Sequence, residues 1–197
     1  MQWTVIIPVK PAESAKSRLG LGPELARAIA LDTVAAAVAS AAVARVLVVT
    51  SDPGFRPPGA EIVAEESLAG IDTAIRTAAA LAPDGPRAAL LGDLPSLRPG
   101  DLAAALALAP HHPRAFVTDR DGTGTTLVTA VAGMLLITAF GPDSAAAHRA
   151  LGLAELALPA GSTVTADVDT LEHLEVARVL GLGPATRIAL ESQPVPR

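Results

Sequence analysis

The sequence predicts a single α/β domain with a mostly parallel sheet that helices cover on both faces. Short runs of apolar and β-branched residues alternate with longer helical segments along the 197 residues, and this alternation is typical of βαβ units. Most of the short runs are mainly apolar and do not alternate with polar residues, as expected for strands that are buried on both faces. Hydrophobic residues make up 50% of the chain but aromatic residues only 2%, so small aliphatic side chains have to fill the core.

Proline and glycine punctuate the predicted elements. We expect strands at residues 3–8, 45–50, 61–64, 88–91, 114–118, 126–131 and 153–158. We expect helices at residues 23–40, 71–81, 99–109, 142–151 and 171–180. Pro23, Pro99 and Pro142 stand in first helical turns, where an N–H group has no intrahelical partner to lose. Residues 1–190 are expected to form the domain and residues 191–197 a C-terminal tail.

Composition excludes several classes of protein. The chain has no cysteine, which rules out disulfides and thiolate metal sites. Its formal net charge of −5 argues against a nucleic-acid partner, which needs a basic face. The long apolar segment at residues 28–44 is interrupted by Asp32, and the one at residues 127–140 is too short to span a bilayer. We therefore expect a cytoplasmic protein with neither a nucleic-acid nor a membrane partner.

A basic loop follows the first predicted strand. Lys10 and Lys16 are the only lysines of the chain, and Arg18 comes two residues after the second. Ligands of α/β sheets bind beyond the carboxyl ends of the strands. Neither a Walker A motif nor a dinucleotide G-x-G-x-x-G motif is present, so the cations would act as point charges. We interpret the loop as a site for nucleotide phosphates, and a solvated loop is the alternative.

Carboxylates follow two of the predicted apolar segments. Asp93 stands directly after the strand at residues 88–91, where it could bind Mg²⁺ together with substrate phosphate oxygens or cap a turn. Asp167 and Asp169 alternate along an extended segment, so both side chains could face one cation. Asp169 could instead cap the helix that follows, as could Thr170.

Two further segments could bind an anion. Residues 121–126 combine glycines with three threonine hydroxyls, although an ordinary hairpin loop would look the same. Residues 140–144 introduce a helix, whose first N–H groups and dipole favour an anion. His148 on that helix is expected to be solvated or hydrogen-bonded rather than catalytic.

In order and spacing, these segments resemble the phosphoenolpyruvate or 2-phospho-L-lactate guanylyltransferases of coenzyme F-420 biosynthesis. The similarity extends over residues 3–186 and is carried by residues 9–11, 16–19, 92–95, 121–125, 140–148 and 167–170. It implies a GT-A-like nucleotidyltransferase fold over residues 1–190, related to that of the molybdopterin guanylyltransferases.

The resemblance also implies roles for individual residues. Asp93 and Asp167 would hold Mg²⁺, with Asp169 nearby. The residues implied to bind phosphoenolpyruvate are Thr125, Gly141 and Ser144. Those implied to bind the nucleotide are Lys10, Lys16, Arg18, Gly70 and Asp72, and Lys16, Arg18 and Asp93 are implied to be catalytic. Where the family commonly has Gly-Leu-Asn, this chain has Gly70-Ile71-Asp72.

The implied reaction moves GMP from GTP to phosphoenolpyruvate and releases pyrophosphate, giving enolpyruvyl-diphospho-guanosine. The same reaction on 2-phospho-L-lactate, a GT-A-type glycosyltransferase and a non-catalytic nucleotide-binding module are the alternatives. Pyrophosphate release separates the first two from a glycosyltransferase, which releases a nucleoside diphosphate. The downstream transferase that receives the product is a further expected partner, and assembly into a homo-oligomer is left open.

Overall fold

The computed structural model describes residues 1–10, 22–65, 70–82 and 84–192. Its strands are β1 (Trp3–Pro8), β2 (Val43–Thr50), β3 (Glu61–Ala64), β4 (Arg87–Leu90), β5 (Arg114–Thr118), β6 (Thr125–Ala130) and β7 (Ala154–Glu155). Its α-helices are α1 (Pro23–Ala39), α2 (Ile71–Leu81), α3 (Pro99–Leu108), α4 (Ser144–Ala150), α5 (Leu171–Leu180) and α6 (Pro184–Glu191). Two 3₁₀ turns, η2 (Ala109–His111) and η3 (Thr163–Thr165), complete the described elements.

The described strands form one seven-stranded sheet in the order β3-β2-β1-β4-β6-β5-β7. The pairs β1–β2, β1–β4, β2–β3 and β5–β7 are parallel. Strand β6 runs antiparallel to both of its neighbours, β4 and β5. The predicted mostly parallel sheet is therefore confirmed, and the loop between β5 and β6 is the hairpin that the sequence left as an alternative.

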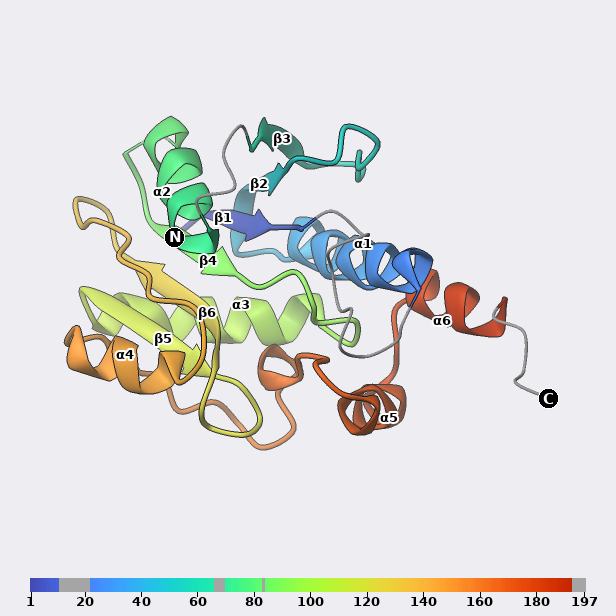
Figure 1. Ribbon diagram of the computed structural model, residues 1–197. Helices are drawn as coiled ribbons and strands as arrows, with labels where there is room; N and C mark the ends of the chain where they lie inside the picture. The colour runs from blue at the N-terminus through green and yellow to red at the C-terminus, as the bar shows by residue number, and fades with distance from the viewer. Residues whose placement is uncertain (11–21, 66–69, 83, 193–197) are drawn as a thin grey trace.

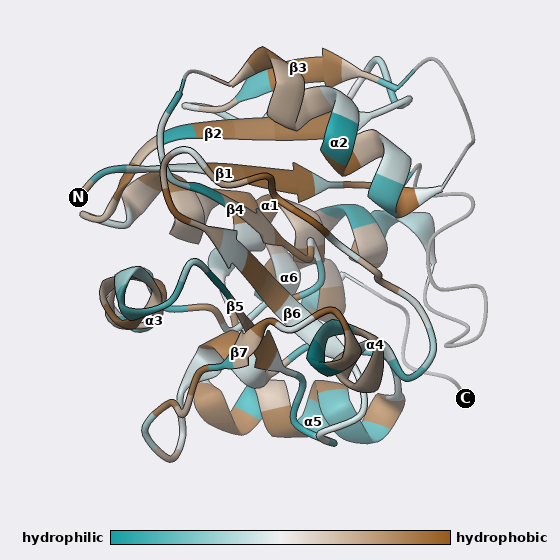
Figure 2. Cartoon of the chain, turned by 90° about the vertical axis from the view of Figure 1, so that its left-hand side faces the viewer, coloured by the Kyte–Doolittle hydropathy of each residue, from teal (hydrophilic) through white to brown (hydrophobic). Residues whose placement is uncertain are grey.

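Helices cover both faces of the sheet, as predicted (Figure 1). On one face, Val5 and Ile7 of β1 belong to a cluster with apolar residues of α1 and α3. On the other face, Ile6 belongs to a cluster with residues of α2 and with Ala145 of α4. Adjacent β1 residues thus face opposite layers, which explains why the strand is apolar without alternation from Val5 to Ile7. Figure 2 shows the mainly apolar character of β1 and of the later part of β2.

The last two helices form a smaller cluster against α1. Leu25 and Ile29 of α1 contact apolar residues of α5 and α6, and α6 lies beside α1 in Figure 1. None of the helices in the described ranges is both long enough and apolar enough to cross a bilayer.

Most elements agree with the predictions within one or two residues, and the differences at α4, β7 and α6 have particular causes or consequences. Helix α4 begins at Ser144 and not at Pro142, because Asp143 at its N-cap has a left-handed φ of 54°. Strand β7 keeps only two of the residues expected at 153–158. Helix α6 was not expected, because Pro184 is a helix starter as well as a helix terminator. The predicted tail lies mostly at residues 193–197, outside the described part of the chain.

Candidate active site

Two carboxylates meet beyond the end of β4. Gly92 and Asp93 continue the chain after β4, and the N–H of Val168 donates to the backbone oxygen of Asp93 at 3.0 Å. This bond places the segment that carries Asp167 beside the end of the strand. A Cβ on Gly92 would lie 3.2 Å from the backbone oxygen of Pro8, so the loop passes close to the end of β1. The structure therefore brings together Asp93 and Asp167, the two residues that the resemblance implies as metal ligands.

Asp167 lies in an environment that disfavours its negative charge. Its side chain is 7% exposed, and its Oδ1 has no hydrogen-bond partner among the described residues. Burial first, and then the charges of Asp93, Asp169 and Asp119, raise the pKa of Asp167 to about 8. Concentrated negative charge of this kind is typical of a cation site. No three acidic or histidine side chains in the described ranges are arranged to hold a metal by themselves, so ligands from a substrate would have to complete the coordination.

Asp169 is exposed, next to the start of α5. The Oγ1 atom of Thr170 accepts from the N–H of His173 at 3.1 Å, so Thr170 is the N-cap of α5. Asp169 is therefore not needed as the cap. The Nε2 atom of His173 lies 3.4 Å from a carboxylate oxygen of Asp121 in the hairpin loop. The start of α5 and the hairpin loop are thus linked.

The predicted acceptor residues also gather in one place. Thr125 begins β6 and Ser144 begins α4, and each is 2% exposed. Gly141 precedes the helix with a φ of 145°, and its backbone oxygen accepts from the N–H of Ser144 at 3.2 Å. The N–H of Ala145 donates to the backbone oxygen of Thr123 at 3.0 Å, which fixes α4 against the hairpin loop. We call Thr125, Gly141 and Ser144 the acceptor region.

The acceptor region and the carboxylates lie at the same edge of the sheet. In the antiparallel ladder Leu90 of β4 is paired with Leu127 of β6, and the N–H of Leu91 donates to the backbone oxygen of Thr126 at 2.9 Å. The start of β6 therefore lies beside the end of β4. Asp93 follows that end after Leu91 and Gly92, so Asp93 and Thr125 flank the same pair of strands.

His148 is a feature of the acceptor region that sequence reasoning underestimated. Its side chain is fully buried, its Nδ1 lies 2.9 Å from Oγ1 of Thr125, and its Nε2 accepts from the N–H of Ala139 at 3.0 Å. The histidine was expected to be solvated or hydrogen-bonded, and the second expectation is confirmed. Burial lowers the pKa of His148, while the charge of Asp72 and the backbone of Ser144 act in the opposite direction.

Asp119 was also missed. Its carboxylate accepts from the N–H groups of Thr123 and Gly124 at 3.0 and 2.8 Å. A Cβ on Gly124 would overlap that carboxylate, so only glycine fits there without rearrangement. An aspartate followed by a Thr-Gly pair four and five residues later is a turn signal that could have revealed this contact.

The predicted nucleotide residues are more scattered. Lys10 is exposed beyond the end of β1, and Lys16 and Arg18 lie outside the described residues. Gly70 is the N-cap of α2 with a φ of 93°, which favours glycine. Asp72 in the first turn of α2 accepts from the N–H of Phe140 at 3.1 Å. The structure thus places Asp72 against the segment that leads to the acceptor region, and its nucleotide contact remains a prediction.

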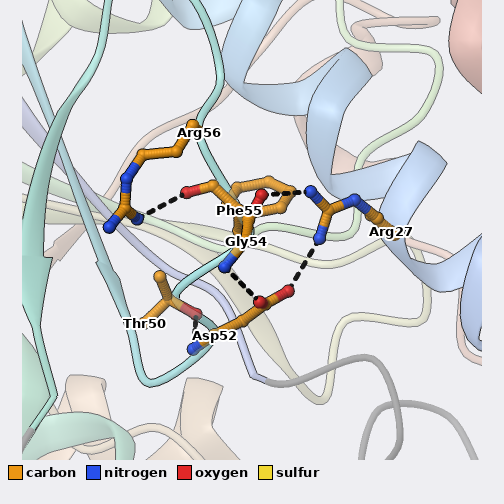
Figure 3. Close-up of polar contacts among 6 residues, drawn as sticks. All are labelled: Arg27, Thr50, Asp52, Gly54, Phe55 and Arg56. Atoms are coloured by element: carbon orange, nitrogen blue, oxygen red, sulfur yellow. Dashed lines mark hydrogen bonds and ion pairs between the residues drawn. The ribbon is translucent and has the colours of Figure 1, made fainter.

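The loop after β2 is fixed at the same edge of the sheet. Arg27 of α1 donates to the carboxylate of Asp52 at 2.7 Å and to the backbone oxygen of Gly54. Its guanidinium also lies 5.2 Å from the centre of the Phe55 ring. Figure 3 shows these groups around the turn at residues 52–54. These bonds hold the loop close to the end of α1 that follows the basic loop.

Comparison with known proteins identifies relatives along the whole chain. No protein-family model matches it. A phosphoenolpyruvate guanylyltransferase from Streptomyces avermitilis is 49% identical and matches over 96% of this chain and 94% of its own length. A phosphoenolpyruvate guanylyltransferase from Streptomyces coelicolor is also 49% identical, over 94% of each chain.

Solved structures share the fold at low sequence identity. A protein from Desulfovibrio desulfuricans, provisionally named a nucleotide-diphospho-sugar transferase, is 20% identical with a TM-score of 0.69, covering 97% of this chain and 95% of its own. A nucleotidyl transferase from Methanothermobacter gives a TM-score of 0.63 at 16% identity, over 91% and 97%. The manganese complex of Rv0371C from Mycobacterium tuberculosis gives 0.58 at 17%, over 90% and 97%. The fold is that of the nucleotidyltransferases, and the full-length relatives at 49% identity show that the chain belongs to the phosphoenolpyruvate guanylyltransferase family.

Proposed function

We propose that this enzyme transfers GMP from GTP to phosphoenolpyruvate, with release of pyrophosphate, in coenzyme F-420 biosynthesis. The observation that carries the proposal is the placement of two sites at one edge of the sheet. The carboxylates of Asp93 and Asp167 meet beyond β4, and the acceptor region lies at the adjoining start of β6. One site suits the charge of a nucleotide with its cation, and the other suits a small anion. The names of the relatives supply the two substrates.

The reaction needs positioning more than proton transfer. A phosphate oxygen of phosphoenolpyruvate attacks the α-phosphorus of GTP, a new P–O bond forms, and the bond to the β-phosphate breaks as pyrophosphate leaves. Because the attacking oxygen is already anionic, no general base is required. Catalysis then rests on holding the two anions in line and on offsetting their repulsion.

Different residues of the chain would bind the two substrates. Thr125 and Ser144, with the backbone at Gly141, would bind the carboxylate and phosphate of the acceptor. Lys16 and Arg18 would contact the β- and γ-phosphates of GTP, where negative charge grows as pyrophosphate leaves. The burial of Thr125 and Ser144 beside Gly141 supports the first assignment, and the second rests on the order of the sequence, in which Lys16 and Arg18 follow β1.

Asp93 and Asp167 would hold a divalent cation, with Asp169 close by, and we propose Mg²⁺. The fit rests on the raised pKa of Asp167 and on its Oδ1, which has no partner among the described residues. A relative of the same fold has been solved with manganese. When bound, the cation would supply charge neutralisation for the α-phosphate.

Pyrophosphate release tests the proposal. Purified enzyme is incubated with GTP and Mg²⁺, and phosphoenolpyruvate, 2-phospho-L-lactate or a sugar is added in separate reactions. We expect pyrophosphate and a guanylylated product of matching mass with phosphoenolpyruvate. Release of GDP with a sugar would instead identify a glycosyltransferase, and GTP binding without turnover of any acceptor would identify a binding module. Product formed faster with 2-phospho-L-lactate would reassign the acceptor.

A further inference from the structure

His148 is fully buried, and both of its ring nitrogens take part in hydrogen bonds. Its Nε2 lies 3.0 Å from the backbone nitrogen of Ala139, and its Nδ1 lies 2.9 Å from Oγ1 of Thr125. The rings of Phe116 and Phe140 lie against it, with centroids 5.6 and 5.5 Å away. The imidazole therefore has one orientation, with each nitrogen assigned to one neighbour.

The donor and acceptor roles follow from the backbone. The N–H of Ala139 can only donate, so Nε2 of His148 must accept and cannot carry a hydrogen. A neutral imidazole then carries its hydrogen on Nδ1, and burial favours this neutral ring. The hydrogen on Nδ1 points to Oγ1 of Thr125, so the threonine hydroxyl accepts in this bond.

The direction of the Thr125 hydroxyl follows in turn. A hydroxyl has a single hydrogen, and a group that already accepts from Nδ1 of His148 cannot also donate to it. In the described part of the chain, no other hydrogen-bond partner of the Thr125 hydroxyl is found. Its hydrogen is therefore not used in a hydrogen bond to any of the described residues.

We propose that His148 is a positioning residue that aims the Thr125 hydroxyl hydrogen at the anionic acceptor substrate. The inference rests on the proposed function in taking Thr125 as a residue that binds the acceptor and a carboxylate or phosphate oxygen as its ligand. In the opposite tautomer Nε2 would carry the hydrogen and would point it at the N–H of Ala139, so two donors would face each other. Nδ1 would then be an acceptor, and the Thr125 hydroxyl could donate to it. His148 thus sets a donor direction without contacting the substrate itself.

The same ring also helps to shape the second part of the acceptor region. Nε2 of His148 binds the N–H of Ala139, and Oδ1 of Asp72 binds the next N–H, that of Phe140. These two bonds hold the backbone immediately before Gly141. The charged groups that face the ring from neighbouring elements are Asp72 of α2 and, across Phe116, the guanidinium of Arg149.

Two substitutions separate the roles of the ring nitrogens. His148→Asn places an amide nitrogen near the position of Nδ1 and keeps a donor for Thr125, whereas His148→Gln places an amide oxygen near the position of Nε2 and keeps the acceptor for Ala139. We expect His148→Gln to weaken phosphoenolpyruvate binding about tenfold and His148→Asn to weaken it less. Thr125→Val should weaken it as much as His148→Gln, and the double variant should lose little more. The exposed His112 gives a matched control, since His112→Gln should bind as the wild type does.

The measurements are titration calorimetry with phosphoenolpyruvate, steady-state kinetics with each substrate varied, and ¹⁵N NMR of the four histidines. We expect His148 in the wild-type enzyme to show a protonated Nδ1 and a bare Nε2, with the KM for phosphoenolpyruvate rising in the variants and the KM for GTP unchanged. The opposite tautomer, or wild-type affinity in His148→Gln and Thr125→Val, would overturn the inference. The NMR result decides even if a variant does not fold. Failure of the wild-type enzyme to bind phosphoenolpyruvate would instead refute the proposed function.

Discussion

Asp32 offers a sharp test of how α6 is held against the domain. It lies in the middle of α1 and is 6% exposed. Its carboxylate accepts from the N–H groups of Ala185 and Thr186 at 3.0 and 2.7 Å. These are N–H groups of the first turn of α6, which lack intrahelical partners. Asp32 therefore caps a helix that begins more than 150 residues further along the chain.

The cost of Asp32→Ala can be worked from these bonds. Each bond to a charged group contributes about 1.5–3 kcal/mol, whereas loss of an ordinary N-cap costs about 0.5–2 kcal/mol. The cost is smaller than the sum of the two hydrogen bonds for two reasons. Water can reach the N–H of the half-buried Ala185, and alanine at position 32 is a better helix former than aspartate. We expect the free energy of unfolding to fall by about 2–4 kcal/mol, which corresponds to a Tm lower by about 4–16 °C.

Gly183 allows the same interaction to be probed from the other side. A Cβ there would overlap the Asp32 carboxylate, although the φ of −64° suits any residue. Gly183→Ala should therefore be destabilising in the wild type and less so, by at least about 1 kcal/mol, in the Asp32→Ala background. Gly100→Ala is the matched control, because nothing lies within 4 Å of its added Cβ.

Urea denaturation followed by circular dichroism measures all four proteins of this cycle and the control. Gly100→Ala should change the free energy of unfolding little or raise it by about 0.4–1 kcal/mol. A loss below about 0.5 kcal/mol for Asp32→Ala, the lower limit for an ordinary cap, together with additive effects of the two substitutions, would refute the assignment of Asp32 as the cap of α6.

Four further predictions concern the site. Asp93→Asn should lower pyrophosphate release about 100-fold with the free energy of unfolding intact, and near wild-type turnover at limiting Mg²⁺ would exclude the metal role. Ser144→Ala should raise the KM for phosphoenolpyruvate about tenfold and spare that for GTP, and the reverse pattern would reassign the acceptor region. Asp72→Asn keeps an oxygen for the N–H of Phe140 but removes a negative charge near the bound anion, so the KM for phosphoenolpyruvate should fall; a higher KM would contradict this. Burial lowers the pKa of His148, so the folded protein favours the neutral imidazole. The contribution of this neutral ring to the free energy of unfolding is complete above about pH 6.5, and it is lost as the pH falls through the lowered pKa. Between about pH 8 and 5, the free energy of unfolding should therefore fall less in His148→Asn than in the wild type. Urea titrations at the two pH values measure both losses, and equal losses would refute the reasoning.

Much of the fold could be predicted because its signals are local. Mainly apolar strands without strict alternation predicted a sheet covered on both faces, and β1 contributes to both core clusters. The start of α4 could not be predicted, because residue type alone does not give Asp143 its left-handed φ of 54°. The end of α5 at Leu180 was predicted correctly, but a proline soon after a helix is also typical of a stop, which concealed the start of α6 at Pro184.

Most residues of the candidate site could be named from the sequence, but the hydrogen bonds that join them across distant segments could not. The family resemblance, rather than a local pattern, implied that Asp93 and Asp167 share a metal site, and the bond from the N–H of Val168 to the backbone oxygen of Asp93 brings the two residues close together. No local pattern shows that Asp72 reaches the N–H of Phe140. His148 could be recognised only as a histidine on an apolar helix, because its partners come from β6 and from the segment before Gly141.

The one antiparallel strand among those described explains how the two sites come to adjoin. A parallel connection from β5 would need a crossover of about a dozen residues and would begin β6 at the opposite edge of the sheet. The hairpin instead pairs Thr118 with Thr125 across a short loop, so β6 begins where β5 and β4 end. Asp119 bonds the backbone of that loop and also contributes to the raised pKa of Asp167. The loop that positions Thr125 is therefore electrostatically coupled to Asp167, so the proposed donor for the acceptor and the proposed ligands for a cation adjoin, which is the arrangement that the proposed guanylyl transfer needs.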